Sequence, residues 1–518
     1  MEELIFALLV GLWKLLVGAY KKIRDWLQNR SDQDEEPRRQ PSAERAPQDR
    51  RPVDVLTQRR QDVQEDLTTL EHEAADRGRA LGRTRANRPL GAVLDQTVVQ
   101  QCQRLKDELN RLPPDAGAAV AVERLASRGA AARRLYETAV WMAEQRESPT
   151  HREPLAVADG LARACRRPLV SWARHRLSMP DREPISFVAV RDHVDLRGFP
   201  EAGVAAVALP AAFPGRLQGW PQVAHEVGRD FLDSVQGLKW ELRNRFGLPD
   251  RYPIPFASRG YLSQDEVLLP FGGWLEWLFG DLVGTLLLGP AYPMALRDLL
   301  ASPSNPSAVT AVGITSDSAY YAAEPPAHLR MSAAIAILDD LGFPEEQQRI
   351  WESWNERHGW PQWLYLPTRV EGWIEAPISH FVDTAGQVAD LIVNEALGAL
   401  SEHSLRAIPG LAFSPELQAQ AEQAATAALG RQSPPQSDPR ILLAGVVLAR
   451  ERMPNRSREL LRWLRALLAP VEPDLEETAE PTAAAAAGEE SLATLLRDAV
   501  ILHAALNRPA LGSRPAAR

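Results

Sequence analysis

The feature that most constrains the fold of this chain is a set of charged residues inside two strongly apolar segments, residues 220–232 and 274–292. The first segment reads WPQVAHEVGRDFL and the second reads WLEWLFGDLVGTLLLGPAY. Both have the composition expected of helices. Charged side chains are seldom buried unless they pair with one another or carry out a function. The charged residues in these two helices therefore predict a functional site. The simpler alternative is that they form helix caps and structural ion pairs.

The first of these helices contains His225 and Arg229 four positions apart, which places both side chains on one helix face. The zinc-protease motif HExxH has histidines at both positions, so that they bind one zinc ion while the adjacent glutamate acts as general base. In this chain Arg229 stands at the second position. A guanidinium group stays protonated and offers no lone pair, so Arg229 cannot replace that histidine as a ligand.

Residues 185–335 resemble the zincin metallopeptidases of the gluzincin type, in which a strand precedes the HExxH helix and a glutamate on a later helix completes the metal site. The apolar run 204–209, followed by the helix at 220–233, is similar to that order. The resemblance implies zinc as cofactor and a peptidase-like cleft. It also implies roles for four residues: His225 and Glu276 as metal ligands, Glu226 as general base and Asp281 as a supporting acid.

Arg229 leaves three hypotheses for this site. Its guanidinium could take the electrostatic place of the metal and form bidentate bonds with Glu226 or Glu276, in which case zinc is absent. Alternatively, another metal could bind through two protein ligands and water, or another residue could supply the third ligand. The candidates for that ligand are Asp230, which is poorly aimed because five positions are about 140° around a helix, His328 and Glu324. The third hypothesis is coincidence.

Arg330 lies in the stretch PPAHLR, residues 325–330, two positions after His328. We expect its guanidinium to form a salt bridge with Glu324 or Asp317. The alternative is that Arg330 binds an oxyanion or a carboxylate of a ligand.

The N-terminal stretch LIFALLVGLWKLLVGAY, residues 4–20, is apolar except for Lys14 and is followed by a basic cluster. It is shorter than the roughly 20 apolar residues of a spanning helix. Its pattern suits a helix that packs against copies of itself or lies in the membrane interface. Residues 4–28 therefore predict attachment to the bacterial inner membrane from the cytoplasm, and the alternative is burial in its own chain or in a partner protein.

The rest of the chain is organised by changes in composition. The predicted fold is α+β and mostly helical, with a zincin-like domain flanked by helical segments. The expected limits are an N-terminal helix at 1–30, a tether at 31–52, a helical segment at 53–150, the zincin-like domain at 151–410, a helical region at 411–468, a disordered linker at 469–490 and a terminal helix and tail at 491–518. Apolar residues at spacings of three and four predict buried helical stripes within 53–112. Inside the zincin-like domain, helices are expected at about 220–245, 272–289, 328–341 and 383–400.

Net charge bears on whether the protein binds nucleic acid, and cysteine content bears on the redox state of its compartment. A net charge of −9 gives no reason to expect binding to nucleic acid, which usually requires a strongly basic domain. Cys102 and Cys165 lack CxxC spacing, so a reducing compartment is expected. Three functions follow: a membrane-associated pseudo-metallopeptidase that binds or assembles a protein partner, an active zinc metalloprotease with a substitute ligand, and a membrane-anchored assembly component. A homo-oligomer is compatible with each.

Overall fold

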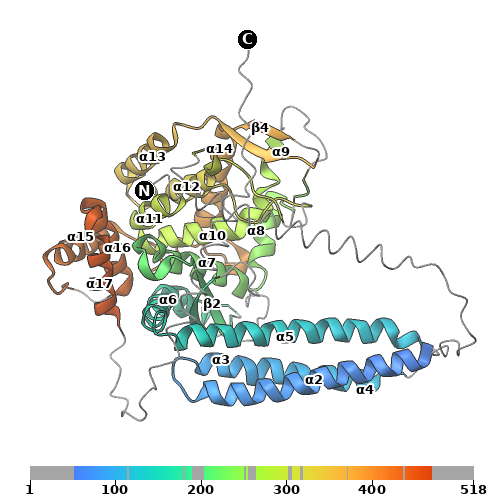
Figure 1. The fold of residues 1–518 in the computed structure, drawn as a ribbon. Coiled ribbons are helices and arrows are strands. Elements are labelled where there is room, and N and C mark those ends of the chain that lie inside the picture. The colour runs from blue at the N-terminus through green and yellow to red at the C-terminus, as the bar shows by residue number, and fades with distance from the viewer. Residues whose placement is uncertain are drawn as a thin grey trace, which may run out of the picture. The chain divides into compact units, whose positions relative to one another are not determined.

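The computed structural model describes residues 52–113, 116–177, 179–180, 182–189, 203–249, 252–254, 264–301, 306–315, 319–369, 372–435 and 438–469 (Figure 1). The predicted N-terminal helix at 4–28 lies outside these described residues, as do the predicted tether at 31–52 except its last residue and the predicted linker, terminal helix and tail after residue 469.

The structure confirms an α+β fold that is mostly helical, with 69% helix and 8% strand. The described strands form two small sheets. Strand β1 (Glu183–Val188) pairs in parallel with β2 (Val204–Leu209), and β3 (Trp363–Pro367) pairs antiparallel with β4 (Trp373–Pro377). Within the described residues, no helix combines the length and the apolar composition that a membrane crossing requires.

The chain divides into two compact units, of which the first comprises Met1–Ala75 and Val98–Arg134. Its described helices lie in α2 (Pro52–Gly82), α4 (Gln100–Arg111) and α5 (Ala119–Glu147); α2 and α5 continue into the second unit. The apolar positions predicted from the 3/4 spacing are buried: Val63, Leu67, Leu70, Ala74, Cys102, Leu105 and Leu109. The first unit is therefore a set of helices packed through narrow apolar stripes.

The second unit comprises Asp76–Thr97 and Leu135–Arg518 and contains the candidate site. Its longer helices are α6 (Arg152–Ala173), α7 (Gln222–Ser234), α8 (Leu238–Phe246), α10 (Phe271–Leu288), α11 (Ala291–Leu300), α12 (Ala327–Ala336), α13 (Pro344–His358), α14 (Ile378–Asn394), α15 (Pro415–Gly430), α16 (Pro439–Arg452) and α17 (Ser457–Leu468). Its shorter helical turns are α3 (Arg88–Ala92), α9 (Gln264–Leu268) and 3₁₀ turns at Phe213–Gly215, Leu217–Gly219, Pro306–Val309, Gly398–Leu400 and Pro454–Arg456. The π-helix Val93–Val99 includes the boundary between the units at Thr97, and the 3₁₀ turn Ala116–Ala118 belongs to the first unit.

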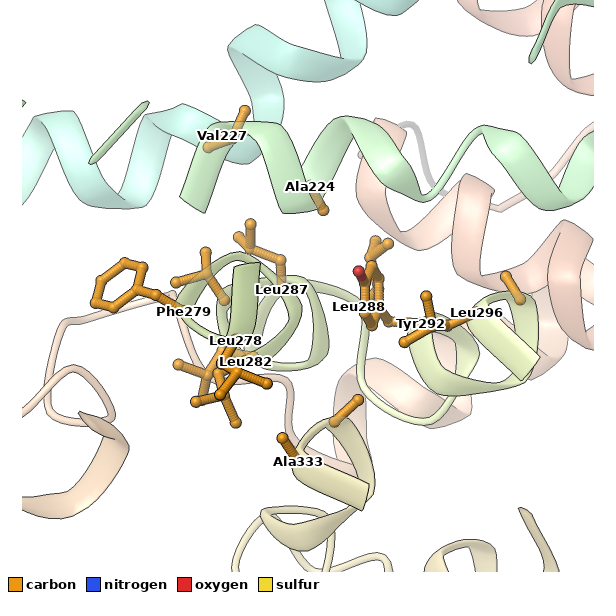
Figure 2. Close-up of a cluster of buried hydrophobic side chains, with 14 of the residues drawn as sticks. Ala224, Val227, Leu278, Phe279, Leu282, Leu287, Leu288, Tyr292, Leu296 and Ala333 are labelled. Carbon is orange, nitrogen blue, oxygen red and sulfur yellow. The ribbon is translucent and has the colours of Figure 1, made fainter. Parts of the chain in front are cut away.

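Helix α10 lies in the centre of this unit, packed against α7, α11 and α12. Figure 2 shows the apolar side chains of α10 between those of α7 and α12, with Tyr292 of α11 beside them. The backbones of α7 and α10 approach closely because Gly228 faces Gly280: a Cβ added at Gly228 would lie 3.1 Å from the Gly280 Cα. The apolar composition of residues 274–292 thus reflects burial of α10 on nearly every side.

Two boundaries differ from the sequence predictions. The helix expected over 220–245 is two helices, because the chain turns at Gly237, whose φ of +82° suits glycine. The helix expected over 383–400 covers Ile378–Asn394 instead. The apolar residues of α15, α16 and α17 belong to the same buried cluster as those of α7 and α10.

Candidate functional site

The candidate site lies where α7 faces α10. The first turns of α7 bring His225, Glu226 and Arg229 into the interior, and all three are buried. Helical spacing explains the arrangement, because residues three and four positions apart lie on neighbouring parts of one helix face. Strand β2 contacts α7 and precedes it in the chain, so the strand-then-helix order expected from the sequence is observed.

His225 is held by a buried carboxylate on α10. Its Nδ1 atom lies 2.8 Å from Oδ1 of Asp281. The Tyr292 hydroxyl donates a hydrogen bond of 2.6 Å to the same oxygen, and Arg330 donates through Nε at 2.8 Å to Oδ2 and through Nη2 at 2.9 Å to Oδ1. Asp281 thus joins α7, α10, α11 and α12 through one carboxylate.

The charges in this cluster are fixed by burial and by their neighbours. Burial by itself would raise the pKa of Asp281, but the Arg330 guanidinium and His225 outweigh it and hold that pKa below its usual range. Burial lowers the pKa of His225, although Asp281 opposes that shift. At neutral pH Asp281 is therefore ionised and His225 is neutral, with its Nδ1–H donating to Asp281.

This tautomer leaves a lone pair on Nε2 of His225. The Nε2 atom is buried, and no described group forms a hydrogen bond with it. Its near neighbour is Oε1 of Glu226, at 3.8 Å. An imidazole whose Nδ1–H is held by a carboxylate and whose Nε2 is available is the arrangement found for metal-ligating histidines.

The Arg229 guanidinium lies near the carboxylates of both Glu226 and Glu276. Its Nη1 donates to Oε1 of Glu226 at 3.0 Å, and its Nη2 lies 3.7 Å from Oε2 of Glu276. Its guanidinium carbon is 4.8 Å from the centre of the Trp277 ring. The Arg229 guanidinium thus contacts both Glu226 and Glu276 with one nitrogen each, whereas the sequence predicted a bidentate bond to one of these carboxylates. Lys239 explains the difference, because it binds Oε1 of Glu276.

The side of the site near Glu276 is the more accessible one. Glu276, Trp277 and Lys239 are each half-buried, and Lys239 lies 3.6 Å from Asp233 as well. Trp277 also contacts the Arg330 guanidinium, at 4.7 Å, and the His225 ring, at 5.2 Å between centroids. One indole therefore lies against two guanidinium groups and an imidazole, a favourable arrangement for cation–π contact.

Asp230 points away from this site, as its position on the helix predicts. Its carboxylate accepts a hydrogen bond of 2.9 Å from Arg166 of α6 and one of 3.4 Å from Arg182, which precedes β1. All three side chains are buried. This ion cluster attaches α7 to the neighbouring helix and strand, and Asp230 does not converge with His225.

The residues of 324–330 separate into two groups. Arg330 faces Asp281, and its Nη1 donates to Oε1 of Glu324 at 3.1 Å, one of the two pairings expected from the sequence. His328 packs against α13 instead. Its Nδ1 accepts a hydrogen bond of 2.9 Å from the Trp354 indole, and its ring lies 5.0 Å from that of Trp351.

These positions do not fit a zinc site with three protein ligands. Among the described residues, no group of three or more histidine, cysteine, aspartate or glutamate side chains is arranged to hold a metal ion. Near His225, the place that a second imidazole would fill is taken by the Arg229 guanidinium.

Sequence reasoning missed Lys239, Trp277 and Tyr292. Tyr292 lies at the end of the quoted apolar segment, and a buried tyrosine needs a partner for its hydroxyl, which was an available signal. Trp277 lies beside Glu276 in the sequence and was not distinguished from the other tryptophans. Lys239 follows the turn at Gly237, and no spacing rule connects it to Glu276.

Comparison with known proteins identifies no relative: no family model, no curated protein and no solved structure matches this chain.

Proposed function

We propose that this chain is a zincin-like pseudo-metallopeptidase whose site holds no catalytic zinc and serves in binding or assembly. The observation that supports this most directly is the 3.0 Å bond from Arg229 Nη1 to Glu226 Oε1. It pairs a fixed positive charge with the carboxylate that would otherwise serve as the general base. A guanidinium placed between Glu226 and Glu276 compensates two carboxylates without a dication.

The surroundings of His225 support descent from a metal site. Asp281 orients the imidazole through Nδ1, as outer carboxylates do for metal-ligating histidines, and directs Nε2 toward the Glu226 side. In this proposal the orienting groups persist while one ligand position has become arginine. The alternative of an active peptidase is less well supported, because Asp230 and His328 form contacts elsewhere and Glu324 pairs with Arg330.

The partner of this site is proposed to be a protein, reached at the cytoplasmic face of the inner membrane. That location rests on residues 4–28, whose apolar and basic pattern remains a prediction from the sequence.

Metal content tests the proposal. Purified full-length protein should hold far less than one equivalent of zinc by mass spectrometry, whereas the variant Arg229→His should bind close to one. The variant restores an imidazole four positions after His225, next to Glu276. Adding Glu276→Ala to Arg229→His should release the zinc again.

Arg229→Gln is the matched control, since it removes the charge without supplying a ligand, and it should stay free of zinc. Tightly held zinc in the unaltered protein would overturn the proposal. A folded Arg229→His variant that binds no zinc would contradict the descent from a metal site.

A further inference from the structure

The outer face of the β3–β4 hairpin carries an aromatic surface remote in sequence from α7. Residues that alternate along each strand point outward, and the register pairs Trp363 with Pro377, Tyr365 with Glu375, and Pro367 with Trp373. The inward residues of both strands, Leu364, Leu366, Ile374 and Ala376, are buried. We call the six outward residues the aromatic face.

The composition of the aromatic face differs from that of an ordinary solvated sheet surface. Exposed faces of antiparallel pairs are usually polar, yet five of these six residues are aromatic or proline. Trp363 is 43% exposed and Trp373 is 41% exposed. Two half-exposed tryptophans on one short hairpin offer a large apolar contact area at low cost in side-chain entropy.

Glu375 gives the aromatic face its charge. It is exposed, lies in the middle of the face opposite Tyr365, and pairs with no basic side chain among the described residues. Arg369, the described arginine just after β3, donates to the Ala319 carbonyl instead. The face therefore presents a carboxylate between two indoles, an arrangement complementary to a planar cation.

We propose that the aromatic face binds an extended protein segment containing proline and arginine. Proline-rich segments adopt the polyproline II conformation before binding and dock onto surfaces lined by aromatic side chains. An arginine in such a segment reaches Glu375 while its guanidinium stacks on an indole. This binding is independent of the site at Arg229.

The size of the aromatic face sets the length of the segment. Trp363 and Trp373 lie near opposite ends of paired five-residue strands, about 13 Å apart along the strand direction. A polyproline II segment advances about 3.1 Å per residue, so about four residues span the face. The central residues of that span lie over Glu375, where the proposal places the arginine.

Binding of a designed peptide tests the proposal. The probe is a labelled ten-residue proline peptide with two central arginines, and its twin has two glutamates instead. Fluorescence anisotropy with the full-length protein should detect binding of the arginine peptide only. Replacing Glu375 with arginine should weaken that binding about tenfold or more and confer binding of the glutamate peptide. Trp363→Ser and Trp373→Ser should each weaken it.

Trp240→Ser is the matched control, because Trp240 is 70% exposed and lies on α8, outside the aromatic face. It should leave the affinity unchanged. Equal binding of both peptides, or no effect of Glu375→Arg, would overturn the proposal. Binding of neither peptide would also overturn it, and binding of phosphatidylcholine vesicles or of a glucose oligomer to the face would not rescue it.

Discussion

The two sides of α7 carry ion clusters that differ in how enclosed they are and in how fully their polar atoms are paired. On one side Asp230 is held between Arg166 and Arg182, and all three side chains are buried. On the other side Arg229 and Glu226 continue into half-buried Glu276 and Lys239, and Nε2 of His225 has no hydrogen-bond partner among the described residues. Adjacent residues of one motif therefore belong to different environments.

The difference lies in how completely pairing alone accounts for the buried charges on each side. The Asp230 cluster is enclosed and joins a helix to the start of a strand, which accounts for its charges without a ligand. The Arg229 side has an oriented imidazole and a partly accessible edge, which are features common in binding sites. Loss of a buried carboxylate should therefore lower stability on both sides of α7. It should change ligand binding only on the Arg229 side.

The largest effect is expected from the carboxylates themselves. Asp281→Asn and Asp230→Asn should each lower the free energy of unfolding by about 3–5 kcal/mol, because each removes the buried carboxylate that compensates buried arginine. Arg330 then keeps only its contact with the exposed Glu324 carboxylate. Urea denaturation followed by circular dichroism measures this. Glu324→Gln is the control: that carboxylate is 53% exposed, and its loss should cost less than about 1 kcal/mol.

The same pair of variants distinguishes the two sides. Placed in the Arg229→His background, Asp281→Asn should weaken zinc binding about 10–100-fold, because it removes the group that orients His225. Asp230→Asn in that background should leave zinc affinity unchanged. Equal losses in both variants would show that the comparison between the two sides is wrong.

A smaller effect extends the comparison to α12, where Arg330 faces the site and His328 faces away. Burial lowers the pKa of His328 to about 4, and its Nδ1 must be unprotonated to accept the Trp354 hydrogen bond. Between about pH 4 and 6.5 the unfolded chain binds more protons, so stability falls as the pH falls through this window.

His328 should account for a loss of about 3 kcal/mol between pH 7 and pH 4. Burial also lowers the pKa values of His225 and His358, so their contributions have the same sign. Urea denaturation at a series of pH values should show a shallower slope for His328→Gln. An unchanged slope would mean that His328 does not titrate with unfolding.

The smallest effect concerns the helix contact that positions the site. A Cβ at Gly280 would lie 2.7 Å from Nδ1 of His225 and 2.9 Å from Cγ of Arg229. Gly280→Ala should therefore cost about 1–3 kcal/mol in unfolding free energy and displace the site side chains. Gly273→Ala is the control on the same helix, since open space surrounds it, and it should stabilise by about 0.5–1 kcal/mol. Thermal unfolding compares the two variants.

Much of the fold followed from local patterns. The apolar run 204–209 is strand β2, and the 3/4 spacing at 53–112 predicted buried helical stripes. Burial of charged residues in the two apolar helices was also predictable. A helix with one face in solvent carries polar residues along that face, and these two helices carry too few polar residues for that.

The partners of those charges were less predictable. Spacing placed His225 and Arg229 on one face and turned Asp230 away, as observed. It could not indicate that Lys239 would bind an oxygen of Glu276, or that Trp277 would contact two guanidinium groups, because both depend on how separate helices pack. His328 and Arg330 lie two positions apart on α12 and have different neighbours for the same reason.

The glycines of α10 suggest how related sequences would vary. Gly280 accommodates His225, and Gly284 accommodates Tyr292, whose Cε2 would lie 2.5 Å from an added Cβ. A larger residue at 284 would fit only with a smaller one at 292, and a larger one at 280 only with a smaller one at 225. An alignment of homologues should therefore show paired substitutions at these positions, so that their covariation would reveal the packing before any further structure is determined.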